Sequence, residues 1–203
     1  CVLFNNNSAL DLIINYHKKT KNKLELSDLE NIKDKNGDNI LSYCFKTDRI
    51  KFINKILNID YNFKSETNNN GENILHLSIL TFSISNIEYI LKLDKSKKIE
   101  IDYSQKTYDD GFTPLQLLIS KLDRFPKDKT SAIINYISPK SNIFEQDNNG
   151  NNILHQCISE MDMINLQYFI KELIKKIENE SVIVDGNFFN FTNIYGYTPL
   201  HLL

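Results

Sequence analysis

A short motif recurs along the chain and constrains its fold more than any other feature. It starts with a glycine, has a small polar residue two positions later, and ends with a leucine four positions after the glycine. Five copies occupy residues 37–41, 71–75, 111–115, 150–154 and 196–200. A sixth, at residues 6–10, has Asn6 in place of the glycine, and Asn is the residue that best tolerates a left-handed backbone after glycine. Such periodicity predicts copies of one structural unit.

Each position of the motif has a mechanical reason. The glycine permits a tight turn with positive φ. The polar residue can accept a hydrogen bond from the free N–H groups at the start of a helix; these residues are Ser8, Asn39, Asn73, Thr113, Asn152 and Thr198. Pro114 and Pro199 suit a first helical turn, where no N–H is needed. The leucines begin the expected buried stripe: Leu10, Leu41, Leu75, Leu115, Leu154 and Leu200.

A second apolar stripe with helical spacing follows each start after a polar break. The stripes comprise Ile50, Ile53, Ile56 and Leu57; Ile87, Ile90 and Leu91; Ile133, Ile134 and Ile137; and Leu166, Phe169, Ile170, Leu173, Ile174 and Ile177. One pair of helices cannot bury both stripes alone. Neighbouring pairs are therefore expected to stack as a solenoid.

The motif resembles the ankyrin repeat, most closely in Thr-Pro-Leu-His at residues 198–201, with near-matches at 73–76, 113–116 and 152–155. The units start 31, 34, 40, 39 and 46 residues apart, against about 33 in the regular family. Insertions of this kind are similar to those in the ankyrin domains of yeast cell-cycle transcription factors. The resemblance implies an all-α ankyrin-repeat solenoid of stacked helix-turn-helix units with short β-hairpin-like loops.

The predicted organisation is one domain over residues 1–203, with units starting near residues 6, 37, 71, 111, 150 and 196. The sixth unit has only six residues of its first helix, and we therefore expect the native protein to continue past Leu203.

Composition excludes several classes of partner. The formal net charge of −2 gives no field that would attract nucleic acid or an anionic membrane, and the apolar runs are too short to span a bilayer. The three cysteines, Cys1, Cys44 and Cys157, have no spacing typical of a disulfide framework or a zinc site. This favours a reducing compartment, nuclear or cytoplasmic.

Residues that could carry chemistry have simpler explanations. His76, His155 and His201 each lie five positions after a turn glycine, and the ankyrin resemblance implies that they bridge turn loops by hydrogen bonds. Cys44 and Cys157 are expected to be packed, unreactive thiols. A basic cluster, His17, Lys18, Lys19, Lys21 and Lys23, is a solvated helix end, a localisation signal or a polyanion contact. No catalytic, cofactor or metal motif is recognised, and we expect no enzyme activity from this segment.

The resemblance implies that a partner contacts the tips of the turn loops. The residues predicted at these tips are Asn36, Asp38, Asn70, Glu72, Asp110, Phe112, Asn149, Asn151, Tyr195 and Tyr197. Phe188 and Phe189, in the longest insertion, are either local core or a hydrophobic docking patch. Residues 122–130 are predicted to form a second irregular loop.

The predicted function is protein–protein interaction as a scaffold or regulatory module, for example in a transcription-factor complex. The alternatives are a regulatory domain of a larger enzyme and a pathogen effector. The expected partner is another protein, with no direct nucleic-acid, membrane or small-molecule ligand.

Overall fold

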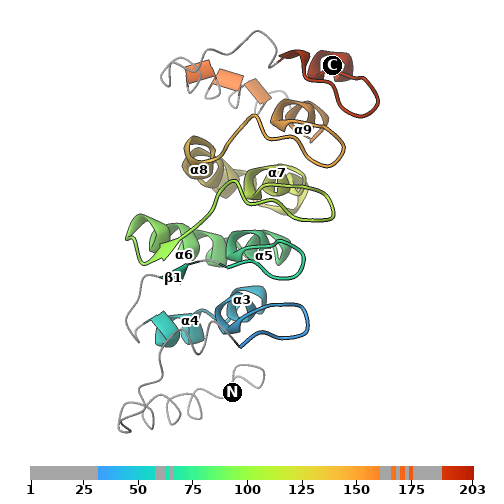
Figure 1. Cartoon of the computed structure of the whole chain (residues 1–203). Helices are drawn as coiled ribbons and strands as arrows, with labels where there is room; N and C mark the ends of the chain where they lie inside the picture. The colour runs from blue at the N-terminus through green and yellow to red at the C-terminus, as the bar shows by residue number, and fades with distance from the viewer. Residues whose placement is uncertain are drawn as a thin grey trace, which may run out of the picture. The chain divides into compact units, whose positions relative to one another are not determined.

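The computed structural model describes residues 32–57, 63–64, 66–160, 166–167, 170–171, 174–175 and 189–203, and this part of the chain is predominantly helical. The predicted all-α class is therefore confirmed. The chain divides into two units, residues 1–102 and 103–203, each shown as paired helices in Figure 1. The predicted copy at residues 6–10, the basic cluster, Cys1 and Phe188 lie outside the described residues.

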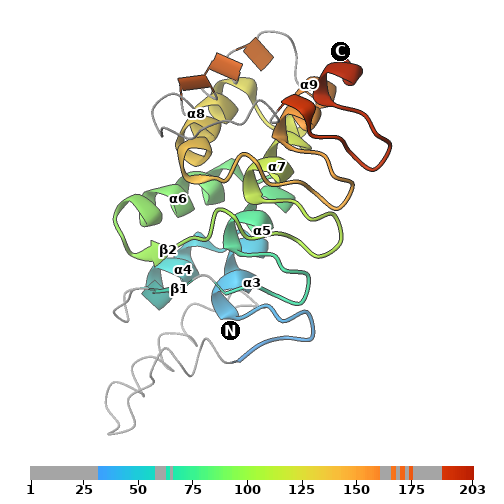
Figure 2. The same ribbon diagram turned by 45° about the horizontal axis from the view of Figure 1, so that its top comes forward.

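The first unit contains two helical pairs. Helix α3 (Ile40–Lys46) is joined to α4 (Ile50–Leu57) by three residues, and α5 (Ile74–Leu80) to α6 (Ile84–Lys95) by another three. Within each pair the helices pack together, and α3 also packs against α5. Strands β1 (Phe63–Lys64) and β2 (Ile99–Glu100) follow the second helix of their pairs and run parallel (Figure 2). Parallel pairing of equivalent segments is what translation from one pair to the next produces.

In the second unit the helices that begin at the motif again pack on one another, but the segments that follow them differ from those of the first unit. Helix α7 (Pro114–Ile119) packs against α9 (Ile153–Glu160), which also contacts the 3-10 helix η4 (Pro199–Leu202). Between α7 and α9 lie η1 (Leu122–Arg124), α8 (Lys127–Ile137) and η2 (Ser138–Lys140).

The prediction of an irregular loop at residues 122–130 is wrong. These residues form η1 and the first turn of α8. Phe125 is buried beside them, which explains how an aromatic residue is accommodated at this connection. Pro126 precedes the first residue of α8, where a proline leaves no helical hydrogen bond unmade.

The predicted helix caps are confirmed in the four α-helices that begin at the motif. Asn39 Oδ1 accepts the N–H of Ser42 at 2.9 Å, and Thr113 Oγ1 accepts that of Gln116 at 3.3 Å. Asn73 and Asn152 each accept two backbone N–H groups, at 3.1 and 3.2 Å. Each such cap stabilises its helix by about 1 kcal/mol.

Among the described residues, the motif leucines are core residues with one exception. Leu41, Leu75, Leu115 and Leu154 are at most 2% exposed. Leu200 is 61% exposed, and its predicted burial is therefore wrong. It lies on η4, which packs against α9 on one side, and no further helix of the described residues covers the other.

The second stripes are also largely buried, although Ile50, Leu57 and Ile170 are only half-buried. Their core members are Ile53, Ile56, Ile87, Ile90, Leu91, Ile133, Ile134, Ile137 and Leu166. Ile174, predicted in the last stripe, is exposed, and Phe169, Leu173 and Ile177 lie outside the described residues. None of the helices in the described part combines the length and apolar character that a membrane span requires.

Helix α6 ends in a Schellman motif with lysine at the position usually taken by glycine. Lys97 has φ of 57°. Its N–H donates to Asp94 O at 2.9 Å, and the N–H of Lys98 donates to Leu93 O at 3.0 Å, the two bonds that define the motif. Asp48 and Phe82, which follow α3 and α5, have φ of 56° and 54°. A residue with a Cβ is strained in the left-handed conformation, and each of these three helix ends therefore carries a small energetic cost.

We expect Lys97→Gly to stabilise the protein. Glycine removes the left-handed strain, and its greater freedom in the unfolded chain offsets only part of that gain, leaving about 0.5 to 1 kcal/mol. The measurement is the urea midpoint, with Lys98→Gly as the matched control because the neighbouring residue has no positive φ. A lower midpoint for Lys97→Gly than for Lys98→Gly would contradict the assignment.

Candidate functional site

The turn loops before the helices are organised around one side-chain oxygen each. In the loop of Gly37, Asp34 Oδ1 accepts the backbone N–H of Asn36 at 2.8 Å and that of Asp38 at 2.9 Å. The backbone closes the same loop, because Gly37 N–H donates to Asp34 O at 2.9 Å. An Asp or Asn three residues before the glycine thus forms an Asx turn. An antiparallel bridge between Lys33 and Asn39 flanks it, giving the predicted hairpin-like loop.

The same arrangement recurs in three other loops. Asn68 accepts the N–H groups of Asn70 and Glu72, Asp147 those of Asn149 and Asn151, and Asn193 those of Tyr195 and Tyr197, at 2.8–3.1 Å. The role of the four acceptors, Asp34, Asn68, Asp147 and Asn193, was not predicted from the sequence. The signal that identifies them is an Asp or Asn three positions before the motif glycine.

The loop of Gly111 is one residue longer and uses a different oxygen. Thr107 Oγ1 accepts the N–H of Phe112 at 3.0 Å, and Thr107 O accepts the N–H of Gly111 at 3.1 Å. The extra residue brings Tyr108 to the surface of this loop, where it is 64% exposed. Tyr108 was not predicted as a surface residue of the tip.

Within each unit, neighbouring loops are joined by backbone hydrogen bonds. In the first unit, Asn69 N–H donates to Asn36 O at 2.9 Å. In the second, Asn148 N–H donates to Asp110 O and Ile194 N–H to Asn149 O, both at 2.9 Å. The side-chain amides add Asn69 Nδ2 to Lys35 O, and Asn148 Nδ2 to Tyr108 O and Asp109 O, at 2.7–3.1 Å.

These bonds explain the glycines. A Cβ on Gly37 would collide with the Asn69 side chain and lie 2.8 Å from Asn69 N, and one on Gly111 would meet Asn148 in the same way. Gly196, with φ of 76°, has nothing within 4 Å of its ideal Cβ position. The glycine therefore permits both the positive φ of the turn and, at Gly37 and Gly111, the close approach of the next loop.

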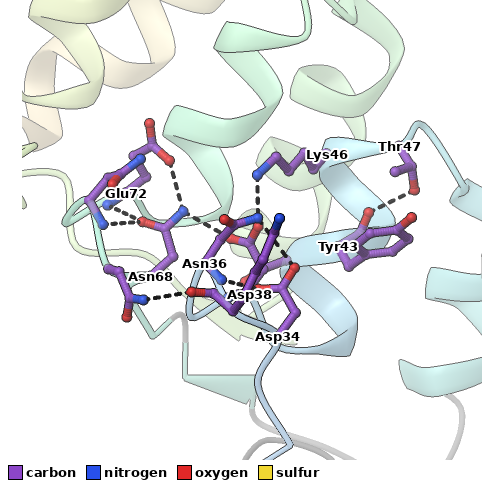
Figure 3. A network of polar contacts seen from close by, with 12 residues as sticks. Asp34, Asn36, Asp38, Tyr43, Lys46, Thr47, Asn68 and Glu72 are labelled. Carbon is purple, nitrogen blue, oxygen red and sulfur yellow. Dashed lines mark hydrogen bonds and ion pairs between the residues drawn. The ribbon is translucent and has the colours of Figure 1, made fainter.

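Asp38, predicted to contact a partner, instead holds the first two loops together. It is 2% exposed. Its Oδ2 accepts from Lys46 Nζ at 2.8 Å, and its Oδ1 accepts from Asn68 Nδ2 at 2.9 Å (Figure 3). The hydrogen bond to Asp38 raises the pKa of Lys46, more than partial burial lowers it. Glu72, half-buried, accepts from Asn68 Nδ2 at 2.8 Å and belongs to the same network.

The other predicted tip residues divide into two groups. The exposed ones are Asn36, Asn70, Asp110, Asn149, Tyr195 and Tyr197, together with Phe189 of the insertion. Asn151 and Phe112 are half-buried. Asn151 is engaged within the loops, since it donates to Asp147 Oδ2 at 3.2 Å and accepts from Asn193 Nδ2 at 3.0 Å.

Tyr195 and Tyr197 are the most prominent aromatic residues of the tips. They are 71% and 50% exposed. Their ring centroids lie 6.4 Å apart with a 35° tilt, and Tyr197 also lies 6.3 Å from the ring of His201. The backbone N–H groups of both residues donate to Asn193 Oδ1, and the loop therefore holds the two rings at neighbouring surface positions.

The predicted bridging role is confirmed for His155, which is buried. Its Nδ1 accepts the N–H of Asn152 at 3.2 Å, and its Nε2 lies 2.9 Å from Tyr197 O in the next loop. A carbonyl oxygen can only accept, so Nε2 carries the proton. His76 is buried with the same contact to the Asn73 N–H at 3.2 Å. Both rings are therefore structural.

The two described cysteines are buried, as predicted. Burial raises the pKa of the Cys44 thiol to about 12, although Arg49 opposes the shift, and burial raises the pKa of Cys157 well above its usual value. A protonated, covered thiol is a poor nucleophile. Over the described part of the chain, no three His, Cys, Asp or Glu side chains are grouped so as to hold a metal ion.

Comparison with known proteins adds no relationship. No protein-family model matches the chain, and no curated protein matches it.

We expect Gly37→Ala to destabilise the protein more than Gly196→Ala. Both substitutions place a side chain at positive φ, at a cost of about 1 kcal/mol, but only Gly37→Ala also collides with Asn69, raising its total to about 2 to 4 kcal/mol. Urea unfolding of the two variants measures the difference. Equal destabilisation would show that the contact between the loops is not as close as described.

We expect His155→Ala to cost about 2 to 3 kcal/mol, because it removes both hydrogen bonds and leaves a buried N–H unpaired. His201→Ala is the matched control. His201 makes the same contact with the Thr198 N–H, at 3.1 Å, but is exposed, and its loss is expected to cost less than about 0.5 kcal/mol. Thermal unfolding of both variants checks the prediction, and similar melting temperatures would contradict it.

Proposed function

We propose that the chain is an ankyrin-like solenoid and that its turn loops hold another protein, as a scaffold or regulatory module. The observation that carries the proposal is the joined row of loops in each unit. Backbone N–H and C=O groups of the loops bond within a loop or to the next loop of the same unit. Outward side chains such as Asn70, Asn149 and Tyr195 are therefore presented by a hydrogen-bonded backbone.

The helical pairs support the solenoid part of the proposal. In both units the first helix of one pair packs on the first helix of the next, α3 on α5 and α7 on α9. The caps, leucines and turn glycines of successive pairs occupy equivalent places. A chain of such pairs gains its stability between neighbours, and its exposed loops can vary without changing the core.

The chemistry of the exposed loop side chains supports protein binding. Tyrosine, asparagine and aspartate dominate, and a rigid tyrosine offers a large contact area for little loss of conformational freedom. Pre-organised loops also lower the entropy lost on association. The buried thiols Cys44 and Cys157 are unpaired, which supports an intracellular location, nuclear or cytoplasmic.

Site-specific photo-crosslinking tests this function. Benzoylphenylalanine placed at Asn149 or Tyr195, in cells of the source organism, is expected to capture one and the same protein. Placed at Ala132, exposed on α8, it is expected to capture none of it.

The captured protein is then purified and its affinity measured. Tyr195→Ala is expected to weaken binding about tenfold. Equal capture from Ala132, or unchanged affinity for the Tyr195→Ala and Asn149→Ala variants, would reject the loops as the binding surface.

A further inference from the structure

We propose that the loops of the second unit bind a partner segment that carries arginine. These three loops, residues 107–113, 147–152 and 193–198, are called the second loop row. The inference rests on the proposed function and specifies the partner's chemistry at one part of that surface.

Exposed aromatic rings lie at both ends of the second loop row. Tyr108 is in its first loop, and Tyr195 and Tyr197 are in its third. The hydrogen bonds from Asn148 to Asp110 and from Ile194 to Asn149 join the three loops in this order. Ile194 is also exposed, at 63%. A surface with this much exposed aromatic and aliphatic area is typical of an interaction site.

The charges of the second loop row are all negative and partly uncompensated. Asp109 and Asp110 are exposed beside Tyr108. Their backbone carbonyls accept from Asn148, whereas their carboxylates have no partner within the described residues. Asp147 is buried and its carboxylate is used by its own loop. The row contains no lysine or arginine, and Lys106, just before it, is paired with Glu145 at 2.9 Å.

The loops of the first unit lack this combination. Asp34 uses its carboxylate to close its loop, and Asp38 is paired with Lys46. Lys35 is exposed at the same tip, and Glu72 accepts from Asn68. These loops carry three carboxylates and one lysine, but each carboxylate already accepts a hydrogen bond or an ion pair. Residues 34–38 and 68–72 also contain no aromatic ring, and these loops therefore lack the free carboxylates and exposed rings of the second loop row.

Arginine matches both features of the second loop row. Its planar guanidinium can donate two hydrogen bonds to one carboxylate and can also stack on a tyrosine ring. Lysine provides the positive charge but not a planar group with two parallel N–H donors. An acidic segment would be repelled by the carboxylates of Asp109 and Asp110. A guanidinium can therefore pair with the free carboxylates of Asp109 and Asp110, and arginines along the segment can stack on the exposed rings at either end of the row.

The length of the segment follows from the spacing of the loops. Stacked helices lie about 8 to 10 Å apart, so the first and third loops are separated by about 20 Å. An extended peptide advances about 3.3 Å per residue, and about six residues would span the row. A peptide of twelve residues is long enough to reach both ends.

Phage display of random twelve-residue peptides on the immobilised full chain tests the inference. The selected peptides are expected to be enriched in arginine above lysine. Their affinity is expected to fall about tenfold in the Asp109→Asn/Asp110→Asn variant and by a similar factor in Tyr195→Ala/Tyr197→Ala. Asp128→Asn, which removes an exposed carboxylate on α8 outside the turn loops, is the matched control and should leave affinity unchanged. Circular dichroism verifies that each variant is folded.

The outcomes separate this inference from the proposed function. Selected peptides without arginine enrichment, or arginine peptides that bind the Asp109→Asn/Asp110→Asn variant as tightly as the native chain, overturn the inference. Failure to select any peptide overturns it as well. The crosslinking at Asn149 and Tyr195 decides the proposed function independently, because it makes no assumption about the charge of the partner.

Discussion

Each turn loop of standard length depends on one side-chain oxygen placed three residues before the glycine. In the loop of Gly37, Asp34 Oδ1 accepts the backbone N–H groups of Asn36 and Asp38, and an Asx turn of this kind holds the loop backbone in one conformation. Once these donors are satisfied locally, the loop has a fixed shape before it meets its neighbour. The fixed loop allows the Asn69 N–H to donate to Asn36 O. A side chain on Gly37 would collide with Asn69, and this position must therefore remain glycine.

Much of the local structure could be predicted from the sequence, because each feature depends on residues a few positions apart. Asn39, Asn73, Thr113 and Asn152 were expected to cap helices, and they do so through oxygen atoms two or three residues from the donors. The burial of the motif leucines follows from the same periodicity. The bridging role of His155 came from the ankyrin resemblance, and only the structure identifies Tyr197 O as its acceptor.

The features that could not be predicted depend on neighbours distant in sequence or on single insertions. Asp38 has the same place in its loop as Tyr197, yet it is buried because Lys46 and Asn68 both reach it. Tyr108 is three residues before Gly111, where the standard loops have Asp or Asn. The loop of Gly111 has one extra residue, so positions counted back from its glycine do not match those of the other loops, and the exposure of Tyr108 was not predicted. Leu200 has the motif position of a core leucine but no second helix above it among the described residues. In each case the motif fixes the backbone, and the surroundings decide what the side chain does.

Within a few residues, each loop therefore separates the position that holds its fold from a position that can vary. The position before the glycine contributes mainly its backbone to the loop, and the side-chain contact of Asn36 with Asp34, at 3.5 Å, is long. This position holds Asn36, Asn70, Asp110, Asn149 and Tyr195 in the five copies. The position three residues before the glycine contributes its side chain, and it is Asp or Asn in every loop of standard length. A side chain without a structural duty can change from asparagine to tyrosine at little cost in stability, because the hydrogen bonds around it are unaffected. Such a loop can acquire affinity for a partner while the fold beneath it stays the same.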